Sequence, residues 1–134
     1  MIHAFAELTL ETRDPGLLER FYREAFGFEV LSRDGDRIWL GVGERARLGL
    51  WTPGEKEFGD EGGRHVHFAL SASPGTLDDL VERLRAQHAS VRGPVEHPGG
   101  DRSIYVEDPE GNVVEVWDFF RRADGARQGV EALR

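Results

Sequence analysis

The sequence predicts an α+β fold: two βαβββ modules whose sheets pair into one curved mixed sheet around a cleft, with the helices outside. Each half of the chain opens with alternating apolar and polar residues, continues with helical spacing, and ends with three short strand-like segments. One small sheet and one helix bury too little surface alone, so we expect the halves to pair. We therefore expect a single domain over residues 1–118, with modules over 1–52 and 64–118 joined by a linker over 53–63, and a C-terminal tail over 119–134.

The first half begins with "HAFAELTL", where apolar side chains alternate with a polar face that includes Glu7 and Thr9. The next stretch, "RDPGLLERFYREAFGF", predicts a helix with Asp14 as its N-cap, Pro15 as its first residue and Gly27 at its end. Three strand candidates follow, namely "FEVLS", "RIWLGV" and "RLGLW", with "RDGD" and "GERA" as the turns between them.

The same order of patterns restarts at "HVHFALS", after a polar, glycine-rich stretch. His65 and His67 lie on one face of this predicted strand, and Val66, Phe68 and Leu70 lie on the other. A second helix is predicted by "PGTLDDLVERLRAQHA", and three further strands by "VRGPVE", "RSIYVED" and "NVVEVWD". Identity between the halves is slight, so the repeat rests on the order of the elements.

The alternation also identifies the side chains that would line the cleft. On the faces that carry Glu7 and the two histidines, polar groups stand next to large aromatic ones, as they do in small-molecule pockets. The substrate-binding candidates on these faces are Thr9, Trp39, Trp51, Ser103, Tyr105 and Trp117. The three tryptophans fit a core position between sheets equally well, and the pattern does not separate the two interpretations.

The composition restricts the classes of partner. The chain has 17 Lys and Arg against 25 Asp and Glu, a formal net charge of −8, which argues against nucleic acid and membrane surfaces. The N-terminus lacks the basic region of a signal peptide and no apolar run is long enough to cross a membrane, so we expect a cytoplasmic protein that binds a small molecule. Because there is no cysteine, any metal must be held by His, Asp, Glu or water.

Three motifs, "ERFYREAFGFEV", "HFALS" and "YVEDPEGNVVEVWD", together resemble the vicinal oxygen chelate superfamily, which includes glyoxalase I, extradiol dioxygenases and bleomycin-binding proteins. The resemblance implies a divalent metal ion (Fe, Mn, Mg, Ni or Zn) held by Glu7, His67 and Glu115. Gly49 stands near the place where glyoxalase I-like members have a fourth ligand, and it has no side chain to coordinate. The resemblance also implies a homodimer, because the family often completes its cleft with a second subunit.

His65 is a competitor of His67, because it lies two residues away on the same predicted face. It is a candidate catalytic acid–base group, an alternative metal ligand, or a hydrogen-bond partner of a ligand. A histidine at the rim of the cleft with no catalytic role fits the same pattern.

The resemblance leaves two classes of function open. The first is a divalent-metal-dependent enzyme, a dioxygenase, lyase or isomerase, that binds a small oxygenated substrate through two oxygens and stabilises negative charge on them. The second is a metal-free drug- or metabolite-binding protein of the bleomycin-resistance type. In that protein, Trp39, Trp51, Tyr105 and Trp117 would stack against a planar cationic ligand. Analysis of the metal content would discriminate between the two.

Overall fold

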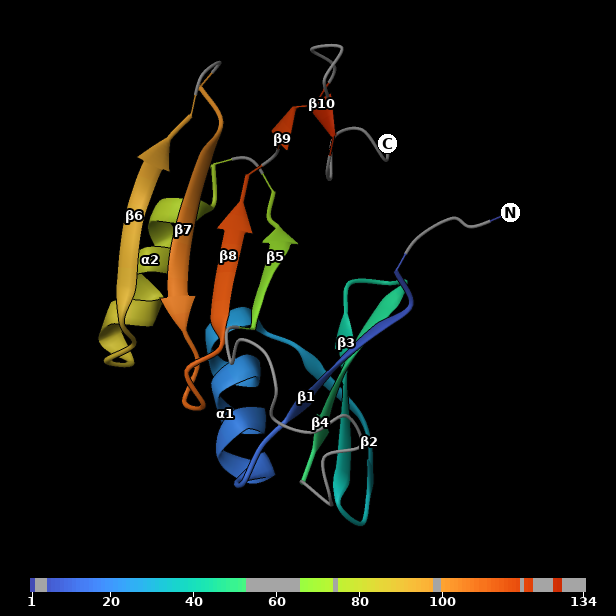
Figure 1. The fold of residues 1–134 in the computed structure, drawn as a ribbon. Helices are drawn as coiled ribbons and strands as arrows, with labels where there is room; N and C mark the ends of the chain where they lie inside the picture. The colour runs from blue at the N-terminus through green and yellow to red at the C-terminus, as the bar shows by residue number, and fades with distance from the viewer. Residues whose placement is uncertain are drawn as a thin grey trace. The chain divides into compact units, whose positions relative to one another are not determined.

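The computed structural model describes residues 1, 5–52, 66–73, 75–97, 100–118, 120–121 and 127–128 of the chain. It divides the chain into two compact units, residues 1–64 and 65–134 (Figure 1). The predictions for His65, for the linker over 53–63 and for most of the C-terminal tail lie outside the described residues. No helix in the described part of the chain is long and apolar enough to cross a membrane.

The first unit contains the predicted βαβββ order. Its elements are β1 (Glu7–Glu11), α1 (Pro15–Phe26), β2 (Glu29–Asp34), β3 (Arg37–Val42) and β4 (Ala46–Trp51). The four strands form one mixed sheet in the order β1-β4-β3-β2, in which β1 is parallel to β4 and the other neighbours are antiparallel.

The second unit repeats this arrangement. Its elements are β5 (His67–Ser71), α2 (Leu77–Ala86), β6 (Val91–Glu96), β7 (Arg102–Glu107) and β8 (Val113–Trp117). The sheet order is β5-β8-β7-β6, with β5 parallel to β8. Within the segment predicted as a tail, β9 (Phe120–Arg121) and β10 (Arg127–Gln128) pair as a short antiparallel ribbon. Two βαβββ modules, each with a mixed sheet and a helix, are therefore confirmed.

The ends of α1 follow from local chemistry, as the sequence predicts. The Asp14 side chain accepts a hydrogen bond from the Leu17 N–H at 3.0 Å, which satisfies a donor that the helix cannot pair itself. Pro15 begins the helix, where its missing N–H costs nothing. Gly27 ends it at φ +71°, a left-handed conformation that glycine adopts without strain.

Each sheet buries its apolar face against its own helix. In the first unit, Leu18 and Tyr22 of α1 are fully buried, together with Leu40 and Leu50 of the sheet. In the second unit, α2 lies behind β6 and β7 in Figure 1. The apolar residues buried in this second core are Leu77, Val81, Leu84, Ile104, Val106, Val114 and Val116. Because side chains alternate along a strand, the polar faces that carry the site candidates point away from these helices.

Candidate functional site

The polar face of the second sheet brings five of the predicted residues to one surface. In the pairing register, Tyr105 is opposite Glu115, and Ser103 is opposite Trp117. His67 is opposite Val113, and Val113 precedes Glu115 by two residues on β8. His67, Ser103, Tyr105, Glu115 and Trp117 therefore share one face, as their alternation predicts.

One side-chain contact on this face joins His67 and Glu115. His67 Nε2 lies 3.2 Å from Glu115 Oε1, and the glutamate is only 8% exposed. The second carboxylate oxygen, Oε2, accepts a hydrogen bond from the indole N–H of Trp117. A buried carboxylate is costly unless it is paired, and here each of its oxygens has a partner. The Trp117 bond also fixes the carboxylate so that Oε1 faces His67.

Trp117 is held in turn by a histidine that the sequence analysis did not select. The His97 ring stacks on the Trp117 ring with centroids 4.1 Å apart and an interplanar angle of 21°. His97 Nε2 lies 2.8 Å from the hydroxyl oxygen of Ser103, which is fully buried. His97 follows β6, where strand alternation no longer assigns a side chain to a face. The sequence "HPGG", which stands between the two strands, was the available signal.

Tyr105 and Arg92 extend this face beyond the His67–Glu115 pair. The Tyr105 ring meets the His67 ring edge-on, with centroids 6.1 Å apart. The Arg92 guanidinium lies over the Tyr105 ring, 5.6 Å from its centroid. Arg92 was not among the candidates, since a single arginine in a short strand carries no distinguishing pattern.

The polar face of the first sheet carries the other predicted residues. Glu7 is opposite Arg47, and Thr9 is opposite Gly49. Glu7 Oε1 lies 3.4 Å from Arg47 Nη2, and both side chains are more than 40% exposed. An exposed ion pair of this kind contributes little to stability. The Glu7 carboxylate is therefore only weakly constrained by its neighbour.

The Trp39 ring lies directly against Gly49 on the polar face of the first sheet. A Cβ atom at Gly49 would lie 2.6 Å from Cζ3 of Trp39 and 3.1 Å from Oγ1 of Thr9. Distances this short leave no room for a side chain. The position near the family's fourth ligand therefore lacks a coordinating group, and its space is filled by an indole.

Two arginines cover the aromatic side chains of the first sheet. Arg37 lies 4.0 Å from the centroid of Trp51, and Arg47 lies 3.9 Å from the centroid of Trp39. The two indoles meet edge-to-face with centroids 6.2 Å apart. One face of each ring already holds a cation, so stacking of a second planar cation there would be opposed by like charge.

Comparison with known proteins places these features in a family. The profile of the Glyoxalase/Bleomycin resistance protein/Dioxygenase superfamily matches residues 4–116. The chain belongs to this superfamily. The resemblance stated from the sequence motifs is thereby confirmed.

Individual relatives agree with this membership. The chain is 30% identical over 126 residues to Virulence protein STM3117 of Salmonella typhimurium, covering 89% of this chain and 86% of the relative. The crystal structure of that protein matches with a TM-score of 0.69 and 27% identity, over 87% of this chain and 97% of that one. Lactoylglutathione lyase from Agrobacterium tumefaciens matches with a TM-score of 0.69 and 29% identity, over 85% and 92% of the two chains.

The superfamily implies a divalent metal ion. The distance between His67 and Glu115 shows whether these two side chains could bind one ion together. Two donors that bind one ion at right angles, each about 2.1 Å from it, are about 3.0 Å apart. The observed separation of 3.2 Å between Nε2 and Oε1 fits two adjacent ligand positions, and it is also an ordinary hydrogen-bond length. No cluster of three His, Asp or Glu side chains occurs among the described residues. The predicted third ligand, Glu7, belongs to the other unit.

Proposed function

We propose that this chain is a divalent-metal-dependent enzyme of the vicinal oxygen chelate type, acting on a small oxygenated substrate that binds the ion through two oxygens. The 3.2 Å contact between His67 and Glu115 carries the proposal, because it joins an imidazole and a carboxylate on the polar face of one sheet. Glu7 is the proposed third ligand. Two carboxylates and one neutral imidazole would balance the charge of a divalent ion, and hard oxygen donors favour Mn²⁺, Fe²⁺ or Mg²⁺.

The side chains of the second sheet have distinct proposed roles. When bound, the ion supplies a Lewis acid that stabilises negative charge on the substrate oxygens. His67 and Glu115 hold the ion, and Trp117 keeps the carboxylate oriented through its indole N–H. Three protein ligands leave positions open for two substrate oxygens. His65 is the proposed acid–base group.

The superfamily contains several reaction classes, and a dioxygenase, a lyase and an isomerase all use the same first step of binding two oxygens. The similarity to lactoylglutathione lyase supports a lyase or isomerase as one of these classes. We also propose a homodimer, since the family often completes its cleft with a second subunit. Light scattering at the monomer mass over a wide concentration range would contradict the dimer.

Calorimetric titration with Mn²⁺ and Zn²⁺ tests the metal ligands. Loss of a residue that only hydrogen-bonds to a metal ligand typically weakens metal binding about 10–100-fold. His67→Asn and Glu115→Gln remove proposed ligands, so each is expected to weaken binding by more than that. His88→Asn and Glu82→Gln are matched controls, because both residues are exposed in the same unit. His88 has φ +61°, which asparagine tolerates. The controls are expected to bind the ion as the wild type does.

The same titration separates the alternatives. Unchanged affinity in Glu7→Gln would remove Glu7 from the ligand set while leaving the His67–Glu115 pair. If the wild type bound no divalent ion more tightly than millimolar, the metal-dependent enzyme would be wrong. The metal-free binding protein would then be the better account.

A further inference from the structure

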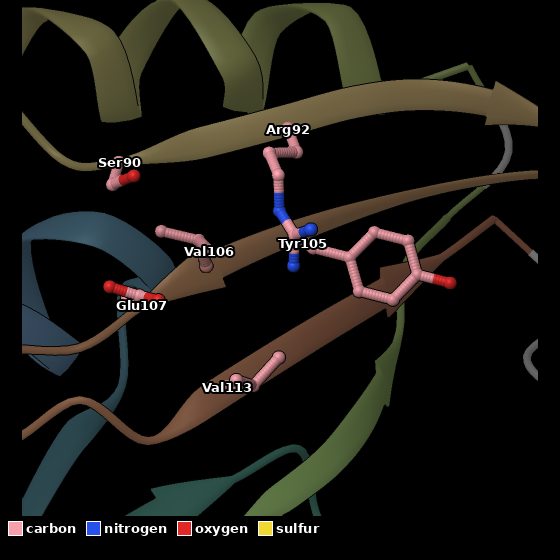
Figure 2. A pocket seen from close by; sticks show the side chains of 6 residues that line it. All are labelled: Ser90, Arg92, Tyr105, Val106, Glu107 and Val113. Atoms are coloured by element: carbon pink, nitrogen blue, oxygen red, sulfur yellow. The ribbon is translucent and has the colours of Figure 1, made fainter.

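A shallow pocket opens on the second sheet beside the His67–Glu115 pair. Its lining residues are Ser90, Arg92, Tyr105, Val106, Glu107 and Val113 (Figure 2). Two of these are direct neighbours of the pair, since Val113 is opposite His67 and Tyr105 is opposite Glu115. The enclosed space is about 10 Å³, about the room that one water molecule needs, and the rest of the hollow is open to solvent. It is far smaller than the about 300–1,000 Å³ of sites that enclose a drug-sized ligand. The pocket therefore suits one end of a small substrate.

Arg92 is the cationic group of this pocket, and it has no carboxylate partner among the described residues. Arg33, Arg47 and Arg102 each pair with a carboxylate at 2.7–3.4 Å. The Arg92 guanidinium instead lies 5.6 Å from the centroid of the Tyr105 ring. Figure 2 shows the guanidinium inside the group of lining side chains, reaching from β6 over β7. Its N–H donors are thus available to a bound molecule.

The absence of an Arg92–Glu107 pair is informative, because the two residues could reach each other. Arg92 is opposite Tyr105, and the Glu107 N–H donates to the Ser90 carbonyl at 3.3 Å, so Arg92 and Glu107 are diagonal neighbours on one face. Diagonal neighbours in antiparallel strands are about 7–8 Å apart, within reach of long side chains. The side chain of Arg92 instead leans over β7, in the direction of β8, the strand that carries Glu115.

We propose that Arg92 binds a carboxylate of the substrate in this pocket, an inference that rests on the proposed function and names its substrate class. A guanidinium offers parallel N–H donors that match the two oxygens of a carboxylate. Arg92 is exposed, and its guanidinium lies within cation–π range of the Tyr105 ring, 5.6 Å from the centroid. The substrate is accordingly a small carboxylic acid whose carboxylate is separate from the two oxygens that bind the ion.

The pairing register limits how far a ligand of Arg92 lies from Glu115. Neighbouring strands are about 4.8 Å apart, which puts β6 about 10 Å from β8. Arg92 spans one of these spacings by lying over Tyr105. A ligand held by Arg92 is therefore in the same cross-strand row as Glu115, about one strand spacing away.

Butyrate and its neutral analogue butyramide are the probes for this inference. The ¹⁵N-labelled full chain is titrated with each while the backbone amide resonances of Tyr105, Val106, Glu107 and Val113 are followed. We expect saturable shifts with butyrate and none with butyramide. Loss of a charge-assisted hydrogen bond predicts that Arg92→Gln weakens butyrate binding about 10-fold or more. Arg83→Gln, which changes an exposed arginine of α2, is the matched control and is expected to bind as the wild type does.

Each outcome bears on one proposal only, because the titration is run without added metal and repeated with one equivalent of Zn²⁺. Butyrate binding that is lost in Arg92→Gln and kept in Arg83→Gln supports the carboxylate site. Equal shifts with butyramide, or unchanged butyrate affinity in Arg92→Gln, would overturn it and leave the metal proposal standing. A chain that binds butyrate through Arg92 yet holds no divalent ion would overturn the metal proposal instead.

Discussion

The two modules share one topology but differ at the centre of their polar faces. In both, the first strand pairs in parallel with the last, and the third residue of the first strand is opposite Gly49 in one module and Glu115 in the other. By the same register, Glu7 corresponds to His67, and Trp39 corresponds to Tyr105. A carboxylate therefore occupies a position in the second module that is bare backbone in the first.

The carboxylate of the second module changes the hydrogen bonding of the tryptophan at the end of the last strand. Trp51 and Trp117 occupy corresponding places at the ends of their last strands. The Trp117 N–H donates to Glu115, whereas the Trp51 N–H is buried and has no hydrogen-bond partner among the described residues. The same residue type orients a carboxylate in one module and supports Arg37 in the other. The two modules share a frame, and only the second, with a carboxylate at the central position, forms a histidine–carboxylate contact there.

Replacing a buried leucine of either helix by alanine should have the largest effect on stability, and the loss should be similar in both modules. Leu18 of α1 and Leu84 of α2 are both fully buried against their sheets. Leu18→Ala and Leu84→Ala are each expected to lower the free energy of unfolding by about 2–5 kcal/mol, measured by urea denaturation. Leu17→Ala is the control, since Leu17 is 39% exposed. A negligible effect in one module alone would show that its helix does not cover a core.

The next largest effect should be a difference in metal affinity between variants of the two tryptophans. Trp117→Phe removes the N–H that orients Glu115 and is expected to weaken divalent-ion binding by about 10–100-fold. Trp51→Phe removes an N–H that bonds to no described residue, so its metal affinity should match the wild type. Calorimetric titration with Mn²⁺ measures both. Equal losses in the two variants would contradict the distinction between the modules.

Adding even a methyl group at Gly49, the central glycine of the first module, should lower the stability of the fold. Gly49→Ala places a Cβ atom against the Trp39 ring and is expected to cost about 1–3 kcal/mol of stability. Shortening the ring in a Trp39→Leu background should reduce that cost, and the difference measures the coupling. Gly41→Ala is the control, because its Cβ would come no closer than 3.3 Å to another atom, and that atom is the flexible end of Leu31. A neutral Gly49→Ala would show that the indole does not occupy this space.

The smallest expected effect concerns the ion pairs that join each helix to its sheet. Arg33 pairs with the buried Glu19 in the first module, and Arg102 pairs with the exposed Asp78 in the second. The Arg102 hydrogen bond, and then its charge, lowers the pKa of Asp78 below its ordinary value of 3.8. The pair therefore stabilises the fold above that value, and this contribution is lost as the pH falls through the lowered pKa.

Asp78→Asn tests this dependence. Urea denaturation of the wild type and the variant should differ slightly at neutral pH and converge in the acid range, below about pH 4. The difference should shrink in high salt, because the pair is exposed. A gap that widens on acidification would show that the sign of the pKa shift is wrong.

Much of this arrangement could be predicted from the sequence, because strand alternation and helix caps are local. Residues such as Thr9 and Tyr105 lie on the predicted faces for that reason. The partners of these residues could not be predicted, because they depend on contacts between strands. His97 lies beyond the end of β6, and only the folded chain stacks it on Trp117. Likewise, nothing in the sequence distinguishes Arg92 from an arginine that pairs with a carboxylate.

X-ray absorption at the zinc edge tests most directly the claim that His67 of the second module binds the ion. The wild type, loaded with one equivalent of Zn²⁺, should show the scattering of a single imidazole together with oxygen ligands. His65→Asn should keep this imidazole signal, and His67→Asn should lose it. An imidazole signal that disappears in His65→Asn and persists in His67→Asn would contradict the account.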